Sequence, residues 1–217
     1  MYKRQVVDEP LYAYYLNEHP NVDHPGRNEI LNSQSINFAD LKEEVFFSKY
    51  NTENVFFKNM AHHFDGLDLS FLLEFRNVFL IRSPKQLIAS FAQVIPNPTI
   101  LDIGLKLEYE IFEFLYKENQ KIIVLDSNEI LKNPISILTQ LCGELEIPFD
   151  TNMLSWEAGP RKEDGVWANH WYENVHKSTS FMKQKTSSRA FPVRLNNLLE
   201  EAQVYYNVLS KHTIKAK

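Results

Sequence analysis

Charged and ionisable side chains follow four short apolar runs of this sequence. They are, in chain order, Asp8 with Glu9, Lys58 with His62 and His63, Arg82 with Ser83, and Asp126 with Ser127. Carboxylates and imidazoles exchange protons in catalysis, and lysine and arginine bind anions. If they meet at one place, these residue types predict a site that binds an anion and performs acid–base chemistry.

The apolar runs themselves are predicted to be strands. They are VVD (6–8), NVFFK (54–58), NVFLI (77–81) and KIIVLD (121–126). Helical patterns separate them, at 10–18, 37–49, 83–94, 99–118 and 133–146, and a last one spans 193–211. This alternation predicts a three-layer α/β/α fold with a parallel sheet buried on both faces. Ligands in such folds bind beyond the carboxyl ends of the strands, where the charged residues are expected to lie.

Composition limits the class of protein. The chain has 217 residues, of which 44% are hydrophobic and 24% charged, and this predicts one domain with a sizeable core. A net charge of −5 argues against nucleic-acid binding but allows a local basic pocket for a small anion. The sequence has no apolar run of membrane-spanning length and no signal-peptide pattern, so we expect a cytoplasmic protein without a membrane partner. Cys142 is predicted to be a core thiol.

The segment FLIRSPKQLIASF has the features of a phosphate site. Ser83 is a good N-cap and Pro84 a good first helical residue, so a helix N-terminus is expected at the ligand edge. Arg82 adds a fork of donors, and Ser90 lies seven residues past Ser83 on the same helical face. Arg82 and Ser90 are therefore candidates for holding one phosphate. The alternative is an arginine paired with a surface carboxylate and a serine packed on the sheet.

The segment GPRKEDGVWANHWY (159–172) combines charged residues, a glycine and large aromatics without a helical or strand period. This pattern is typical of a loop that covers a ligand. The alternative is a surface loop that Trp167 and Trp171 anchor in the core.

Both segments resemble motifs of sulfotransferases that use 3′-phosphoadenosine-5′-phosphosulfate (PAPS). An arginine at a strand end, an SP turn and a serine eight positions later resemble the 3′-phosphate motif, and GPRKEDGVWANHWY is similar to the late loop that closes over that phosphate. The resemblance implies these cofactor-binding residues: Arg82, Ser90, Arg161, Lys162, Gly165 and Trp167. Glu163 stands where the family has a glycine and the spacing is one residue shorter, which favours Arg161 over Lys162.

Two further segments extend the resemblance. VVDEPLYAYYL is similar to the E-P-L segment of carbohydrate sulfotransferases, and NVFFKNMAHHF to the strand end that carries the base or acceptor contacts. With the motifs above, they match over residues 6–181 a bacterial group of the family that is sometimes labelled aminotransferase-like. The implied base is Glu9 or His62, with His63 behind them, and Lys58 would steady the bridging oxygen or the sulfuryl group. Asp8 is expected to orient neighbours or cap the next helix.

The resemblance implies a P-loop NTPase-like fold and transfer of a sulfuryl group from PAPS to a hydroxyl or amine of a small molecule, without a metal. Two alternatives remain open from the residues alone. One is a P-loop nucleotide kinase or NTPase that uses Asp126 as its Mg²⁺ ligand, and the other is a non-catalytic homologue. The sequence indicates neither the acceptor nor the oligomeric state.

The start of the chain carries a separate expectation. MYKRQ resembles a translated sequencing adapter, so residues 1–5 are predicted to be foreign, 6–181 to be the sulfotransferase domain and 182–217 a covering helix. The family's first strand and its S-G-P-R-N-x-S-T loop, which binds the 5′-phosphosulfate, have no counterpart in these 217 residues. We therefore expect an N-terminally truncated fragment that is inactive alone and marginally stable or insoluble.

Overall fold

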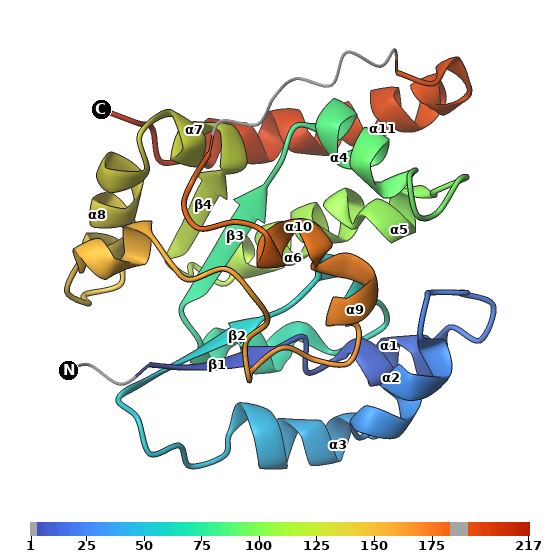
Figure 1. Ribbon diagram of the computed structural model, residues 1–217, viewed down its shortest axis with the longest axis horizontal. Helices are drawn as coiled ribbons and strands as arrows, with labels where there is room; N and C mark the ends of the chain where they lie inside the picture. The colour runs from blue at the N-terminus through green and yellow to red at the C-terminus, as the bar shows by residue number, and fades with distance from the viewer. Residues whose placement is uncertain (1–3, 183–190) are drawn as a thin grey trace. The chain divides into compact units, whose positions relative to one another are not determined.

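The computed structural model describes residues 4–182 and 191–217, and it is a mixed α/β structure with short parallel strands (Figure 1). The chain divides into two units. The first unit combines Met1–Asp65 with Glu157–Thr179, and the second combines Gly66–Trp156 with Ser180–Lys217. Each unit contains one two-stranded parallel sheet.

In the first unit, β1 (Arg4–Asp8) and β2 (Asn54–Lys58) lie side by side (Figure 1). The register places Asp8 opposite Lys58, so the two strands end at the same level. The helices of this unit are α1 (Tyr12–Glu18), α2 (Arg27–Ser33), α3 (Phe38–Leu41), α9 (Ala168–Trp171) and α10 (Glu173–His176), with a π-helical turn at Lys42–Phe46 and a 3₁₀ turn at Ala61–Phe64.

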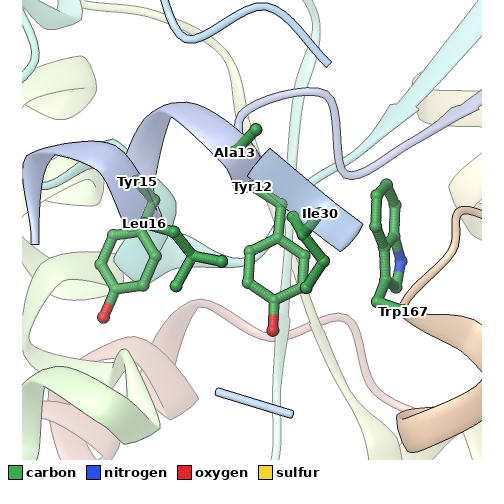
Figure 2. Close-up of a cluster of buried hydrophobic side chains, with 6 residues drawn as sticks. All are labelled: Tyr12, Ala13, Tyr15, Leu16, Ile30 and Trp167. Carbon is green, nitrogen blue, oxygen red and sulfur yellow. The ribbon is translucent and has the colours of Figure 1, made fainter. Parts of the chain in front are cut away.

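The core of the first unit is aromatic. Its buried members gather beside α1 (Figure 2): Tyr12, Ala13, Tyr15, Leu16, Ile30 and Trp167. The rings of Tyr12 and Trp167 meet edge to face with their centroids 5.4 Å apart, a favourable aromatic geometry. Burial of Trp167 therefore fixes the late segment Glu157–Thr179 onto the N-terminal elements.

In the second unit, β3 (Asn77–Ile81) pairs in parallel with β4 (Ile122–Asp126). The α-helices are α4 (Pro84–Phe91), α5 (Ile100–Ile103), α6 (Leu105–Lys117), α7 (Ser127–Lys132), α8 (Pro134–Glu144) and α11 (Asn196–Leu209). The 3₁₀ turns span Leu69–Glu74, Thr151–Leu154, Val193–Leu195 and Ser210–His212. Helix α11 packs against α6 and α4, and Ile137 of α8 is buried against Ile123 and Leu125 of β4.

The strand predictions are confirmed, whereas several helices differ from the expected ranges. Strands β2 and β3 coincide with the predicted runs, β1 begins at Arg4 and β4 at Ile122. The expected helix 99–118 breaks at Gly104, which has a left-handed φ of 72°. The helix predicted for 37–49 ends in the π-helical turn, and the stretch 159–172, expected to be irregular, contains α9.

Burial of the strands is less complete than their composition predicts. Val6 is 40% exposed, Phe56 in β2 is 57% exposed and Leu80 in β3 is 59% exposed. The expectation that the strands are covered on both faces is therefore wrong at these positions. Cys142 is buried, as predicted.

Helix α11 lies within the predicted covering segment 182–217, of which residues 183–190 fall outside the described residues. Across residues 4–182 and 191–217, no helix combines the length and apolar character needed to cross a membrane.

Gly104 provides a test of the break between α5 and α6. Gly104→Ala is expected to lower the free energy of unfolding by about 1 kcal/mol, because alanine is strained at a positive φ. Gly143, exposed in α8, has nothing within 4 Å of an added Cβ, so Gly143→Ala is expected to raise stability. Urea unfolding of both variants measures these changes. Equal destabilisation by the two substitutions would contradict the assignment of the break to the backbone of Gly104.

Candidate active site

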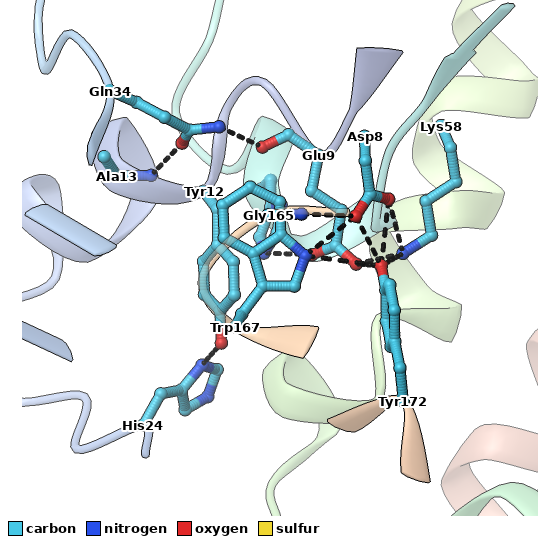
Figure 3. A network of polar contacts seen from close by, with 11 residues as sticks. Asp8, Glu9, Tyr12, Ala13, His24, Gln34, Lys58, Gly165, Trp167 and Tyr172 are labelled. Atoms are coloured by element: carbon cyan, nitrogen blue, oxygen red, sulfur yellow. Dashed lines mark hydrogen bonds and ion pairs between the residues drawn. The ribbon is translucent and has the colours of Figure 1, made fainter. Parts of the chain in front are cut away.

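Four polar side chains converge at the adjacent ends of β1 and β2 (Figure 3). The ammonium group of Lys58 donates a short hydrogen bond to Oε1 of Glu9 and another, of 2.8 Å, to the hydroxyl oxygen of Tyr172. That hydroxyl lies 2.9 Å from Oε1 of Glu9 and 2.9 Å from each carboxylate oxygen of Asp8. Nζ of Lys58 is 3.6 Å from Asp8. One cation and one phenol thus contact two neighbouring carboxylates.

The backbone positions Glu9 by an uncommon conformation. Its φ is 42°, in the left-handed region, which costs a non-glycine residue about 1 kcal/mol or more. The N–H of Glu9 donates to the carbonyl of Lys58 at 2.7 Å, and the carbonyl of Glu9 accepts from the N–H of Tyr12 at 3.1 Å and from the amide of Gln34 at 3.0 Å. Gln34 in turn accepts from the N–H of Ala13. These bonds on both sides of the peptide hold the turn that aims the carboxylate.

Burial dominates the electrostatics of Glu9. The residue is 5% exposed, and this desolvation raises the pKa of its carboxyl group above the ordinary value. The charge and hydrogen bond of Lys58 oppose the rise, the charge of Asp8 adds to it, and the hydrogen bond of Tyr172 opposes it. A carboxylate with a raised pKa is a stronger base than one in water.

Asp8 connects the strand ends to the late segment. Its Oδ2 accepts from the indole N–H of Trp167 at 3.0 Å and lies 3.4 Å from the backbone nitrogen of Gly165. A Cβ on Gly165 would lie 2.1 Å from the indole of Trp167, so only glycine fits there. Asp8 thus orients its neighbours, one of the two roles expected for it. In the structure, Gly165 and Trp167 make this internal connection, and their contact with a cofactor stays a prediction.

His62 and His63 belong to the turn Ala61–Phe64, and both are buried. Nε2 of His63 is 4.0 Å from Oε2 of Glu9, and its ring stacks on Tyr12. Burial first, and then the charges of His24 and Lys58, lower the pKa of His62 to about 3. His63 is shifted in the same direction, for which burial is again the main cause. Both imidazoles are therefore neutral near pH 7.

The predicted phosphate-binding residues are divided between the two units. Arg161 and Lys162 are exposed in the first unit, where the guanidinium of Arg161 donates to the carbonyl of Glu157 at 2.5 Å. Arg82 follows β3 in the second unit, with Ser83 as N-cap and Pro84 as first residue of α4, as predicted. Burial lowers the pKa of the Arg82 guanidinium.

Ser90 is exposed in the last turn of α4, again in the second unit. The structure therefore brings together Glu9, Lys58 and the two histidines, whereas the predicted phosphate contacts come from both units.

Asp126 has a structural role in the second unit. The residue is buried, its Oδ1 caps α7 by accepting from the N–H of Asn128 at 2.7 Å, and its Oδ2 accepts from the hydroxyl of Tyr206 at 2.5 Å. Both oxygens thus have protein donors. Among residues 4–182 and 191–217, no group of three or more histidine, cysteine or acidic residues could hold a metal ion.

Tyr172 is the residue of the site that sequence reasoning missed. It is the last letter of the NHWY run and sits between α9 and α10, as C-cap of the first and N-cap of the second. A tyrosine that follows two aromatic core residues gives no sequence signal that its hydroxyl reaches two carboxylates more than 160 positions earlier.

The fold is that of a mixed α/β domain with polar groups gathered at strand ends, and comparison with known proteins identifies its family. Residues 2–213 match the family model described as "Sulfotransferase domain". The chain therefore belongs to the sulfotransferase domain family. The match begins at residue 2 and gives no support to the predicted truncation, which stays a prediction, as does the assignment of residues 1–5.

Two curated relatives, both from Arabidopsis thaliana, carry the aminotransferase-like label expected for this group. Branched-chain-amino-acid aminotransferase-like protein 1 is 36% identical over 209 residues, and protein 2 is 33% identical over 209 residues. In each case the match covers 96% of this chain but 37% of the relative, so the chain spans little more than a third of their length.

Two solved structures are similar at low identity. The sulfotransferase domain from the Synechococcus PCC 7002 olefin synthase is 15% identical, with a TM-score of 0.47, over 87% of this chain and 73% of that chain. The sulfotransferase domain from the curacin biosynthetic pathway is 17% identical, with a TM-score of 0.44, over 91% and 77%.

The buried state of His62 predicts a pH dependence of stability. An unfolded histidine titrates near 6.5 and the folded one near 3, so between these values the unfolded chain binds a proton that the native state does not. The free energy of unfolding therefore falls as the pH drops below about 6.5, by up to roughly 1.4 kcal/mol per pH unit for each such histidine.

His62→Phe removes this proton uptake, so the variant is expected to lose less stability than the wild type between pH 6 and pH 4. Urea unfolding at several pH values measures both slopes. The opposing contribution of Glu9 is common to the two proteins and cancels in the comparison. Equal slopes would show that His62 is not buried as a neutral imidazole.

Proposed function

We propose that this chain transfers a sulfuryl group from PAPS to a hydroxyl or amine of a small molecule, with Glu9 as the general base. Membership of the sulfotransferase domain family supports the class of reaction. The observation that carries the proposal is the ion pair of the buried Glu9 with the partly exposed Lys58 at neighbouring strand ends. A base and a cation within one hydrogen bond of each other are what removal of a proton and stabilisation of a leaving anion require.

Glu9 is a better base than either histidine. The pKa of its carboxyl group is raised by burial, whereas the pKa of His62 is lowered to about 3 and that of His63 is also lowered. A base whose conjugate acid forms only near pH 3 has little driving force to take a proton from a hydroxyl. Nε2 of His63 lies 4.0 Å from Oε2 of Glu9, so His63 packs beside the proposed base.

Lys58 performs the electrostatic part of the reaction. Its side chain is one-third exposed, and its ammonium group already donates to Glu9 and Tyr172. A lysine has three donors, so one N–H remains for the sulfuryl oxygens or the bridging oxygen. Its positive charge also lowers the pKa of the Glu9 carboxyl group, in opposition to the rise that burial causes.

The donor set of the chain suits PAPS. Each unit offers donors of the kind that bind a phosphate: Arg82 and Ser90 in the second unit, and the exposed pair Arg161 and Lys162 in the first. Gly165 and Trp167 shape the segment that carries the basic pair. Bound PAPS supplies the sulfuryl group and a phosphate leaving group, so one S–O bond forms to the acceptor while another breaks. Glu9 takes the acceptor's proton, and no metal is required.

The finer fold assignment belongs to the same proposal. It is a three-layer α/β/α fold of the P-loop NTPase-like type, with parallel strands. The parallel pairing of β1 with β2 and of β3 with β4 supports it. A cytoplasmic location and the absence of nucleic-acid and membrane partners are likewise proposed on sequence composition.

Glu9→Gln tests the base. Turnover of radiolabelled PAPS in the presence of simple phenols, alcohols and amines is expected to fall roughly 10²–10⁴-fold, because the amide cannot accept the proton. Glu108→Gln is a matched control in the second unit: burial raises the pKa of Glu108 to about 8, so glutamine mimics its neutral form. Wild-type turnover in Glu9→Gln together with loss in His62→Phe would assign the base to the histidine.

Ligand-dependent unfolding tests the nucleotide. At a concentration about 100-fold above its dissociation constant, 3′,5′-ADP is expected to add about 2.7 kcal/mol to the free energy of unfolding. Arg82→Ala should weaken this effect, whereas Arg76→Ala, which removes an exposed arginine paired with Glu146, should not. A larger shift with ATP would favour a nucleotide kinase or NTPase. No shift with either nucleotide would favour a non-catalytic homologue.

A further inference from the structure

The hydroxyl of Tyr172 is the common contact of the candidate active site. It lies 2.9 Å from the nearest oxygen of Glu9, 2.9 Å from both oxygens of Asp8, and 2.8 Å from Nζ of Lys58. The indole nitrogen of Trp167 is 3.3 Å away. A phenol has a single proton to donate, so the two carboxylates compete for it while the ammonium of Lys58 donates to the phenol oxygen.

The two carboxylates depend on this proton to different extents. Asp8 receives the indole N–H of Trp167 at 3.0 Å and lies near the backbone N–H of Gly165, so protein donors solvate it without the tyrosine. Glu9 has only two side-chain donors within hydrogen-bond distance among the described residues, Lys58 and Tyr172. Loss of the phenol hydroxyl therefore affects Glu9 more than Asp8.

The surroundings of Glu9 otherwise favour its protonated form. Asp8 faces it from β1 with a negative charge, Tyr12 from α1 is a neutral phenol, and His63 from the turn Ala61–Phe64 is a neutral imidazole. Lys58 from β2 supplies the positive charge. Burial and the charge of Asp8 thus raise the pKa of Glu9, whereas Lys58 and, to a smaller extent, the hydrogen bond of Tyr172 lower it.

We propose that Tyr172 is a positioning residue that keeps Glu9 ionised, and so ready to accept the proton of the acceptor, and that it makes this state depend on the seating of segment Glu157–Thr179. The proposal rests on the proposed function, with Glu9 as base. The hydroxyl acts through Glu9 and Lys58 and needs no contact with substrate.

The backbone around Tyr172 explains why its hydroxyl reports the position of the whole segment. Its N–H donates to the carbonyl of Ala168 at 2.9 Å, and its carbonyl accepts from the N–H of His176 at 2.8 Å, so it belongs rigidly to the junction of α9 and α10. Trp167, five residues earlier, is 2% exposed and fixes the same junction in the core. A shift of the segment that carries Arg161 and Lys162 would move the phenol away from Glu9. Correct seating of this segment would therefore position the basic pair and keep Glu9 ionised at the same time.

Tyr172→Phe tests the proposal by the pH profile of PAPS turnover. Its acid limb is expected to move upward by about one pH unit, with a roughly tenfold loss of rate below the limb and recovery at higher pH, because a charge-assisted hydrogen bond to Glu9 is lost. Tyr206→Phe is the matched control, since Tyr206 donates to Asp126 in the second unit, and its acid limb should not move. A uniform loss of rate at all pH values in Tyr172→Phe would overturn the positioning role.

A second readout needs no substrate and separates this proposal from the proposed function. Carbon-13 NMR of labelled glutamate, with the Glu9 signal assigned by Glu9→Gln, follows the ionisation of the carboxyl group directly. Its midpoint is expected to rise in Tyr172→Phe and to stay unchanged in Tyr206→Phe; an unchanged midpoint in Tyr172→Phe would refute the proposal even if turnover fell. If the wild type shows this coupling but no sulfuryl transfer, the proposed function fails and the positioning role stands. Should Tyr172→Phe not fold, the same comparison is made in an Asp8→Asn background, where the crowding of negative charge is relieved.

Discussion

The ion pair between the buried carboxylate of Glu9 and the partly exposed Lys58 is the interaction on which the candidate active site depends. An unpaired carboxylate at the depth of Glu9 would cost several kcal/mol, so Glu9 requires the charge of Lys58. The parallel register sets Lys58 opposite Asp8, so its ammonium group lies near Glu9, the residue that follows Asp8. The left-handed backbone of Glu9 then directs its carboxylate to that ammonium group. Tyr172 adds a hydrogen-bond donor to Glu9, and Trp167 adds one to Asp8, so the two carboxylates do not depend on the lysine alone.

The late segment is part of this arrangement and explains why the first unit is discontinuous in sequence. Along the chain, residues Glu157–Thr179 come after β3, β4 and the helices up to α8, yet they pack in the first unit with the N-terminal strands. They bring an indole into the core and a phenol onto the carboxylates. Such long-range contacts close large loops, so forming them costs more conformational entropy than forming local contacts.

Much of the fold was predictable because strand composition and strand-helix alternation are local signals. The β-branched runs gave the strands almost to the residue, and the parallel sheet predicted that Glu9, Lys58 and the histidines would meet. What could not be predicted depends on contacts distant in sequence. The burial that neutralises His62, the reach of Tyr172 and the connection of Asp8 to Trp167 arise only from packing. Gly104 and the π-helical turn were also missed, because a continuous helical period concealed both interruptions.

The left-handed backbone of Glu9 has a consequence for how this position can evolve. Glycine, asparagine and aspartate adopt positive φ more readily than glutamate, so any of them would relax the backbone. Each is shorter, however, and would withdraw the carboxylate from the lysine and the phenol, or remove it. Selection for stability and selection for chemistry thus act in opposite directions on one codon. A search for stabilising substitutions in this domain would choose Glu9 early and, in relieving the backbone strain, would remove the proposed base.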